Sequence, residues 1–171
     1  MNYMPVSNFG PTVVDKVSRM ATSLIVCNSV AHGNTQKIAD AIGEVLSATV
    51  VSTSSAKVSD EALVGFGSGI YRGKFDADLR AFVDSLPPQN GRKAFVFATS
   101  GLAESRFMRF SRSFVDAVED KGFEVVGGFS CRGFDTYGPF RLVGGIRRGK
   151  PDAADLASAR AFAEHLKDSL D

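Results

Sequence analysis

Three short segments of small, hydroxyl-bearing residues and glycines are the part of this sequence best suited to bind a ligand. They cover residues 29–35, 68–73 and 99–102, and each follows an apolar run that is predicted to be a strand. Because the carboxyl ends of parallel strands lie along one edge of a sheet, we expect the three segments to converge there. Their hydroxyls, amides and backbone N–H groups suit a polar or anionic ligand.

The first of these segments has the features of a phosphate-binding loop. It leads into a helical pattern, so its last backbone N–H groups are unpaired and carry a partial positive charge. Ser29, Asn34 and Thr35 add neutral donors, whereas the segment has no Lys or Arg. The Gly-Lys-Ser/Thr ending of a Walker loop and the repeated glycines of a dinucleotide fingerprint are both missing. The sequence therefore favours a monophosphate, and His32 either touches it or packs on the start of the helix.

The elements that position these segments alternate between strands and helices. Apolar runs predict strands at residues 24–27, 50–51, 62–68, 94–98 and 124–131. Helical spacing of apolar residues predicts four helices, with faces formed by Ile38, Ile42, Val45 and Leu46, by Leu79, Phe82, Val83 and Leu86, by Phe107, Phe110, Phe114 and Val118, and by Leu156, Ala159, Phe162, Ala163 and Leu166. Asp152 is expected to open the last helix. This alternation predicts an α/β fold, with a parallel sheet covered by helices on both faces.

Composition narrows the class of protein further. A chain of 171 residues with 44% hydrophobic content is long enough for one domain, which we place at residues 23–171 behind an N-terminal extension at 1–22. The net charge of +1 argues against nucleic-acid binding. Two distant cysteines and two histidines do not have metal-ligand spacing. The sequence has neither a secretory signal nor an apolar run long enough to enter a membrane, so we expect a cytoplasmic protein.

The motifs of this chain resemble those of the flavodoxin family, in particular small bacterial flavodoxin-like proteins with a histidine in the phosphate loop. The similarity runs from about residue 23 to residue 167, and its strongest parts are residues 29–38, 65–71 and 98–101, with residues 131–136 and 144–146 resembling the closing segment. The third predicted strand ends in Gly67-Ser68, not in the aspartate that a response-regulator receiver needs. The resemblance implies a flavodoxin-like three-layer sandwich with a five-stranded parallel sheet in the order 2-1-3-4-5.

The resemblance also implies a non-covalently bound FMN and assigns residues to it. The first loop would contact the phosphate, and the other two would frame the isoalloxazine ring. The implied cofactor-binding residues are Ser29, Val30, Ala31, His32, Gly33, Asn34, Thr35, Ser68, Gly69, Ile70, Tyr71, Arg72, Gly73, Thr99, Ser100, Gly101 and Leu102. The first loop departs from the family pattern hydroxyl-x-hydroxyl-Gly-x-hydroxyl. Without a gap, Val30 and His32 replace its first two hydroxyls, and Val30 and Ala31 can contact phosphate through their backbone alone.

Three functions are compatible with these features. The first is an FMN-binding electron carrier that moves single electrons between redox protein partners, as a monomer or weak dimer without nucleic acid or membrane insertion. The second is an FMN-dependent reductase of quinones or other small molecules that takes electrons from NAD(P)H, with Arg141, Arg147 and Arg148 as the basic donor site. The third is a binding module without flavin. No side chain is placed as a catalytic acid, base or nucleophile, so the flavin would supply the chemistry.

For several residues the sequence is compatible with two different roles. Tyr71 either stacks on the flavin ring or closes the mouth of the pocket, and Arg72 lies near the ring edge or in solvent. The arginines at 106, 109 and 112 form a solvated helix face or a docking patch. Cys27 is expected in the core, and Cys131 is a buried structural cysteine or a redox thiol. The glycine- and arginine-rich residues 133–150 are a functional loop or a covering one.

Overall fold

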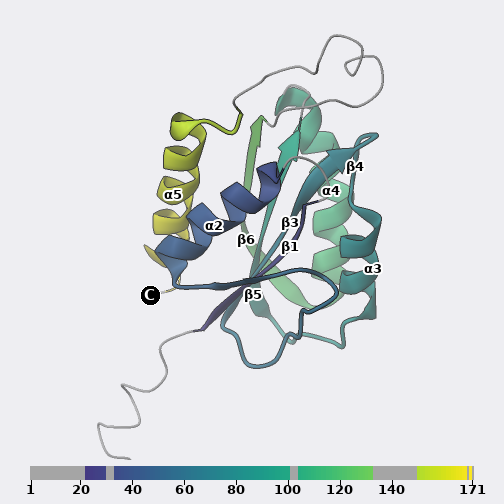
Figure 1. The fold of residues 1–171 in the computed structure, drawn as a ribbon. Helices are drawn as coiled ribbons and strands as arrows, with labels where there is room; N and C mark the ends of the chain where they lie inside the picture. The colour runs from purple at the N-terminus through teal and green to yellow at the C-terminus, as the bar shows by residue number, and fades with distance from the viewer. Residues whose placement is uncertain (1–21, 30–32, 101–103, 133–149, 169, 171) are drawn as a thin grey trace, which may run out of the picture.

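A five-stranded parallel sheet with two helices on each face forms the framework of the protein (Figure 1). The computed structural model describes residues 22–29, 33–100, 104–132, 150–168 and 170. The parallel strands are β1 (Ser23–Asn28), β2 (Thr49–Val51), β3 (Leu63–Tyr71), β5 (Arg92–Ser100) and β6 (Phe123–Arg132). The helices are α2 (Asn34–Leu46), α3 (Ala77–Ser85), α4 (Glu104–Asp120) and α5 (Ala153–Asp168). The sheet order β2-β1-β3-β5-β6 confirms the predicted order 2-1-3-4-5.

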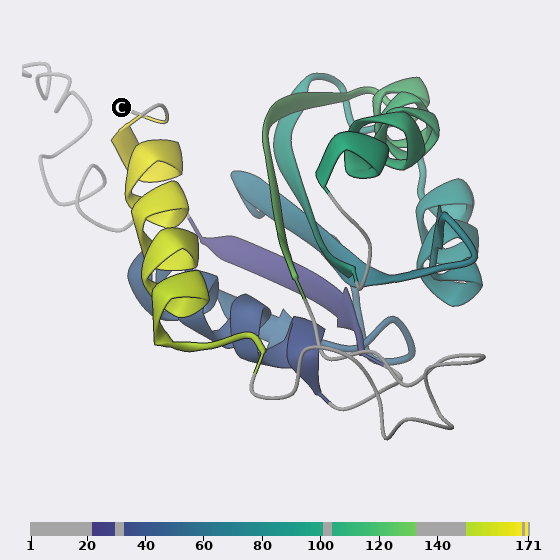
Figure 2. The same cartoon turned by 90° about the horizontal axis from the view of Figure 1, so that it is seen from above.

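The two faces of the sheet carry separate hydrophobic cores because side chains alternate along each strand. Ile25 and Cys27 of β1 pack on the face covered by α2 and α5, and Leu24 and Val26 pack on the face covered by α3 and α4. Figure 2 shows the two pairs of helices on opposite sides of the sheet. The expected α/β sandwich is therefore confirmed.

The helix faces predicted from apolar spacing lie against this sheet. Ile38, Leu79 and Val118 are fully buried. Asp152 opens α5 as expected, because its Oδ1 atom accepts hydrogen bonds from the N–H groups of Ala154 and Asp155. The N-terminal extension and residues 133–149 lie outside the described residues, as do the side chains at 104–110. Within the described ranges, no helix combines the length and the apolar character needed to cross a membrane.

One strand was missed by the sequence analysis. The two-residue strand β4 (Lys74–Phe75) pairs antiparallel with the end of β3, through Ile70 with Phe75 and Tyr71 with Lys74. The turn between them places Arg72 at φ 49° and Gly73 at φ 77°, as a tight hairpin turn requires. The prediction that the third strand ends at Ser68 was therefore wrong. Pairing with β4 extends β3 through Tyr71.

The centre of the sheet depends on glycines in β3 that face phenylalanines in β5. Gly65 is paired with Phe95 and Gly67 with Phe97. A Cβ atom at either glycine would overlap the ring of its partner. The two rings lie 6.0 Å apart between centroids and fill the space above β3. Glycine is therefore needed here for close packing.

We predict that Gly67→Ala destabilises the protein by about 1–3 kcal/mol, because the added methyl group forces the Phe97 ring out of its position. Gly128→Ala in β6 is the matched control, since its Cβ would lie 3.6 Å from Val96 Cγ2, an ordinary contact distance. Urea denaturation should show the loss for the first variant and little change for the second. Equal stabilities of the two variants would contradict this packing.

Both cysteines are buried and reduced. Cys27 and Cys131 are 3% and 7% exposed, respectively, and neither forms a disulfide. Burial, with a smaller effect of the Asp40 carboxylate, raises the pKa of Cys27 to about 12. Burial also raises the pKa of Cys131 to about 12, with Asp155 as the next contribution. Both environments suit structural cysteines, because the thiolate is the reactive form.

We predict that neither cysteine of the folded protein is alkylated by iodoacetamide at pH 8 on the timescale of minutes. With a pKa of about 12, about one thiol in ten thousand is ionised at that pH. Unfolding in urea lowers both pKa values toward that of a free thiol and should make both residues react. Mass spectrometry of labelled peptides measures this directly. Rapid labelling of Cys131 in the folded state would support a redox thiol instead.

Candidate functional site

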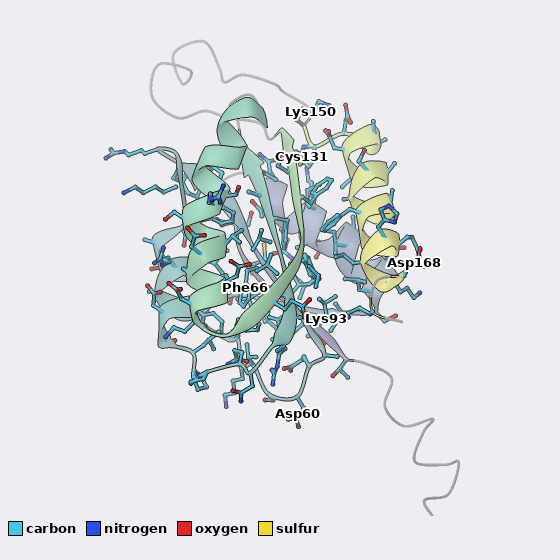
Figure 3. The ribbon with its side chains drawn as sticks, turned by 180° about the vertical axis from the view of Figure 1, so that it is seen from behind. Asp60, Phe66, Lys93, Cys131, Lys150 and Asp168 are labelled. Carbon is cyan, nitrogen blue, oxygen red and sulfur yellow. The ribbon has the colours of Figure 1, made fainter. Side chains whose placement is uncertain are left out.

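The described parts of the three predicted segments lie at one edge of the sheet, where β1, β3 and β5 end. In Figure 3, the labelled residues Cys131 and Lys150 mark this end of the sheet, and Lys93 and Asp60 mark the opposite end. Thr99 and Ser100 belong to β5, and residues 69–71 belong to β3, so these are strand residues instead of the loop residues that we predicted. Val30, Ala31, His32, Gly101 and Leu102 lie outside the described residues.

The start of α2 lies at this edge, and the first N–H groups of a helix have no partner within the helix itself. Gly33 caps the helix in the left-handed conformation, with φ 64°, and nothing described lies within 4 Å of its missing Cβ. The first turn of α2 contains no acidic residue, and the described part of the chain supplies no side-chain cap to it. Asn34 and Thr35 are buried in this turn. The helix end is therefore electrostatically suited to an anion.

Ser29 adds a buried polar atom without a described partner directly after the end of β1. Its Oγ atom is buried and has no hydrogen-bond partner within the described structure. A buried hydroxyl without a partner costs about 1–3 kcal/mol, so such groups usually have a role. Ser29 comes directly after β1 and precedes the first residue of α2 by five positions. This unpaired hydroxyl and the open backbone at Gly33 fit a phosphate group.

The far end of the first loop is held on the α2 face of the sheet. The Oγ1 atoms of Thr35 in α2 and Thr99 in β5 lie 2.8 Å apart and form a hydrogen bond in which either can donate. Thr35 is 2% exposed and Thr99 is 6% exposed, so water does not compete for this bond. This pair joins two segments that the sequence analysis assigned to different parts of the ligand.

The near end of the first loop is held on the other face of the sheet. Asn28, the last residue of β1, donates a hydrogen bond from Nδ2 to Asp76 Oδ1 at 2.6 Å. Asp76 in turn donates from its backbone N–H to Ser68 Oγ at 3.0 Å, and Ser68 Oγ donates to the Gly69 carbonyl at 2.8 Å. These bonds connect the first loop to the second.

Asn28 and Asp76 are site residues that the sequence analysis missed. Asp76 stands directly before the helical pattern of α3, which identifies it as a helix cap. The sequence contains no signal that the same carboxylate would also reach Asn28, 48 residues away. The alternation of β1 offers a partial signal, because Asn28 follows Leu24 and Val26 on the α3 face.

The second segment borders a hollow of about 560 Å³. The hollow is lined by residues 71, 72 and 74–77, with Phe75 as its buried base. Tyr71 is half-buried, and its hydroxyl lies 2.7 Å from the position that a Cβ atom on Gly69 would take. The Tyr71 side chain therefore folds back over Gly69. Arg72 is exposed at the hairpin turn.

The start of α5 holds a charged cluster at the same end of the sheet. Lys150 Nζ lies 2.7 Å from Asp152 Oδ2 and 3.0 Å from Asp155 Oδ2. The hydrogen bond from Lys150 lowers the pKa of Asp152 to about 2, and the same carboxylates raise the pKa of Lys150. The described residues contain no group of three or more His, Cys, Asp or Glu side chains arranged to hold a metal ion. We therefore regard this cluster as a helix-capping ion pair.

Comparison with known proteins identifies relatives of the same fold. Residues 24–123 match the model of the flavodoxin domain. The uncharacterized protein MJ0298 of Methanocaldococcus jannaschii is 37% identical over 147 residues, which cover 84% of this chain and 97% of that protein.

Solved structures agree with this sequence comparison. Oxidised flavodoxin 2 from Bacillus cereus has a TM-score of 0.65 at 20% identity, with 87% of this chain and 99% of that chain covered. An NADH:FMN oxidoreductase in its apo form has a TM-score of 0.65 at 16% identity, with coverages of 89% and 91%. At such identities the structural likeness concerns the fold. The family match covers more than half of the chain, and the protein therefore belongs to the flavodoxin domain family.

Proposed function

We propose that the protein binds FMN and carries single electrons between redox protein partners. The observation that supports this function most directly is the buried Ser29 hydroxyl without a hydrogen-bond partner among the described residues, five residues before the start of α2, a helix end that has no acidic residue in its first turn. Membership of the flavodoxin domain family implies flavin binding. The second and third segments, residues 68–73 and 99–102, would frame the flavin ring at the same edge of the sheet.

In this proposal the chain supplies binding and shielding, and bound FMN supplies reversible one-electron chemistry. Ser29, Gly33 and the first-turn N–H groups of α2 hold the phosphate through neutral donors. The ends of β3 and β5 would border the ring, and Gly69 leaves room for the Tyr71 side chain that folds over it. Tyr71 is placed to cover this part of the site and to exclude water. We assign no acid or base role to any described side chain.

A reductase that accepts electrons from NAD(P)H is the second candidate. The observation that favours it is the hollow beside the second segment, whose rim carries the exposed cations Arg72 and Lys74. Such a hollow has room for part of an anionic nicotinamide nucleotide. The arginines 141, 147 and 148, which we expected to form the donor site, lie outside the described residues. Steady-state oxidation of NADH or NADPH by the purified flavoprotein alone would favour the reductase over the carrier.

We predict that the flavin-free protein binds FMN with a micromolar or lower Kd and that Ser29→Asp weakens this binding by at least about 100-fold. The new carboxylate would face the phosphate in a partly buried site, where like charges repel strongly. Ser113→Asp, on the exposed face of α4, adds the same charge away from the site and is the matched control. Quenching of flavin fluorescence measures each Kd.

Two outcomes would contradict the proposed function. If the unaltered protein fails to quench FMN fluorescence at micromolar concentrations, it does not bind FMN and the proposed function is wrong. If Ser29→Asp and Ser113→Asp bind FMN equally well, the phosphate does not lie at the start of α2. Circular dichroism of both variants establishes that each is folded before titration.

A further inference from the structure

We propose that Asn28 and Asp76 act as a positioning pair that fixes the start of the phosphate loop and so determines how tightly the protein holds the phosphate of FMN. The inference rests on the proposed function and extends it to two residues outside the expected cofactor contacts. Neither residue is assigned a contact with FMN. Their effect is transmitted through Ser29, the residue that follows Asn28.

The pair is held by a carboxylate that already has fixed partners. Asp76 Oδ1 accepts hydrogen bonds from the N–H groups of Asp78 at 2.9 Å and Leu79 at 3.2 Å, as the N-cap of α3. The Asn28 amide is its third donor, at 2.6 Å. Hydrogen bonds to an ionised acceptor are stronger than those between neutral groups. The Asn28 side chain is therefore attached to the end of a helix instead of to a mobile surface group.

The backbone at Asp76 is also held in place by neighbouring elements. Its backbone N–H donates to Ser68 Oγ, and Ser68 is fully buried at the end of β3. The preceding residue, Phe75, stacks on Phe114 of α4, with ring centroids 4.2 Å apart and an interplanar angle of 7°. Asp76 is thus held by α3, β3 and α4 together. The Asn28 side chain, which is hydrogen-bonded to Asp76, is therefore also held in a fixed position.

The phosphate loop therefore has an anchor on each face of the sheet. Its first residues leave β1 next to the Asn28–Asp76 bond on the α3 face. Its last residue, Thr35, is bonded to Thr99 on the α2 face. Fixing Asn28 and Thr35 positions Ser29 and the first turn of α2 before the ligand arrives, and such preorganisation improves affinity without a new contact. The gain applies to the ligand group that the loop contacts, the phosphate.

The effect of removing the Asp76 charge distinguishes a positioning role of Asp76 from a direct electrostatic effect on the phosphate. Asp76 carries a negative charge at the same edge of the sheet as the start of α2, so removing that charge alone would strengthen the binding of an anion there. A positioning role predicts instead that Asp76→Ser weakens the binding of FMN. Serine keeps the N-cap of α3 but is too short to replace the carboxylate opposite Asn28. Asp76→Asn removes the charge and keeps an acceptor oxygen at the same reach.

The test compares FMN with riboflavin, which has the same ring but no phosphate. Fluorescence titration of the unaltered full-length protein, Asp76→Ser, Asn28→Ala and Asp76→Asn gives a Kd for each ligand. We expect Asp76→Ser and Asn28→Ala to weaken FMN binding by about 10-fold and riboflavin binding by less than about two-fold. The double variant Asn28→Ala/Asp76→Ser should be no weaker than either single variant, since both remove one bond. Asp76→Asn should bind FMN as tightly as the unaltered protein or more tightly.

Other results would overturn the inference. Equal losses for FMN and riboflavin would mean that the pair supports the fold in general, and additive losses in the double variant would mean that the two residues act separately. Unchanged FMN affinity in both single variants would also exclude the positioning role. If the unaltered protein binds neither ligand, the proposed function fails and this inference fails with it. If it binds both ligands equally well, the loop does not hold the phosphate. Thermal unfolding midpoints of all variants exclude loss of the fold as the cause.

Discussion

The whole site depends on whether uncharged donors at the end of one helix can hold a doubly charged group. The first loop contains no lysine or arginine, so the attraction must come from backbone N–H groups, hydroxyls and the partial charge of α2. Such donors are effective only when they are already oriented toward the anion and shielded from water. The parallel sheet contributes to this orientation, because it brings the ends of β1, β3 and β5 to one edge.

Rigidity at this edge comes from side-chain bonds as well as from the sheet. Thr35 and Thr99 bond on one face, and Asn28 bonds on the other to Asp76, whose N–H donates to Ser68, so the first loop is attached to both the second and the third segment. Each bond is formed by residues at the end of a strand or the start of a helix, where backbone positions are well fixed. The close packing of Phe97 over Gly67 leaves little freedom for β3 and β5 to shift relative to each other.

The fold was predictable from the sequence because its signals are local and strong. Residues 94–98 are apolar throughout, which indicates a strand covered on both faces, and Ile38 and Ile42 lie one helical turn apart. The hairpin with β4 was not predictable, because two residues carry no periodicity. The convergence of Ser29, Ser68 and Thr99 followed from the fold class. The Asn28–Asp76 bond did not, since it requires knowledge of which strand face meets the start of α3.

The central claim is tested most directly by the ³¹P resonance of FMN bound to the protein, followed from pH 5 to pH 9. Free phosphate monoesters titrate with a pKa near 6. If donors at the start of α2 hold the dianion away from water, the bound resonance should stay at the dianion position throughout this range, because those donors favour the charged form. A bound resonance that shifts with pH as free FMN does would show that the phosphate lies in solvent and would contradict the account.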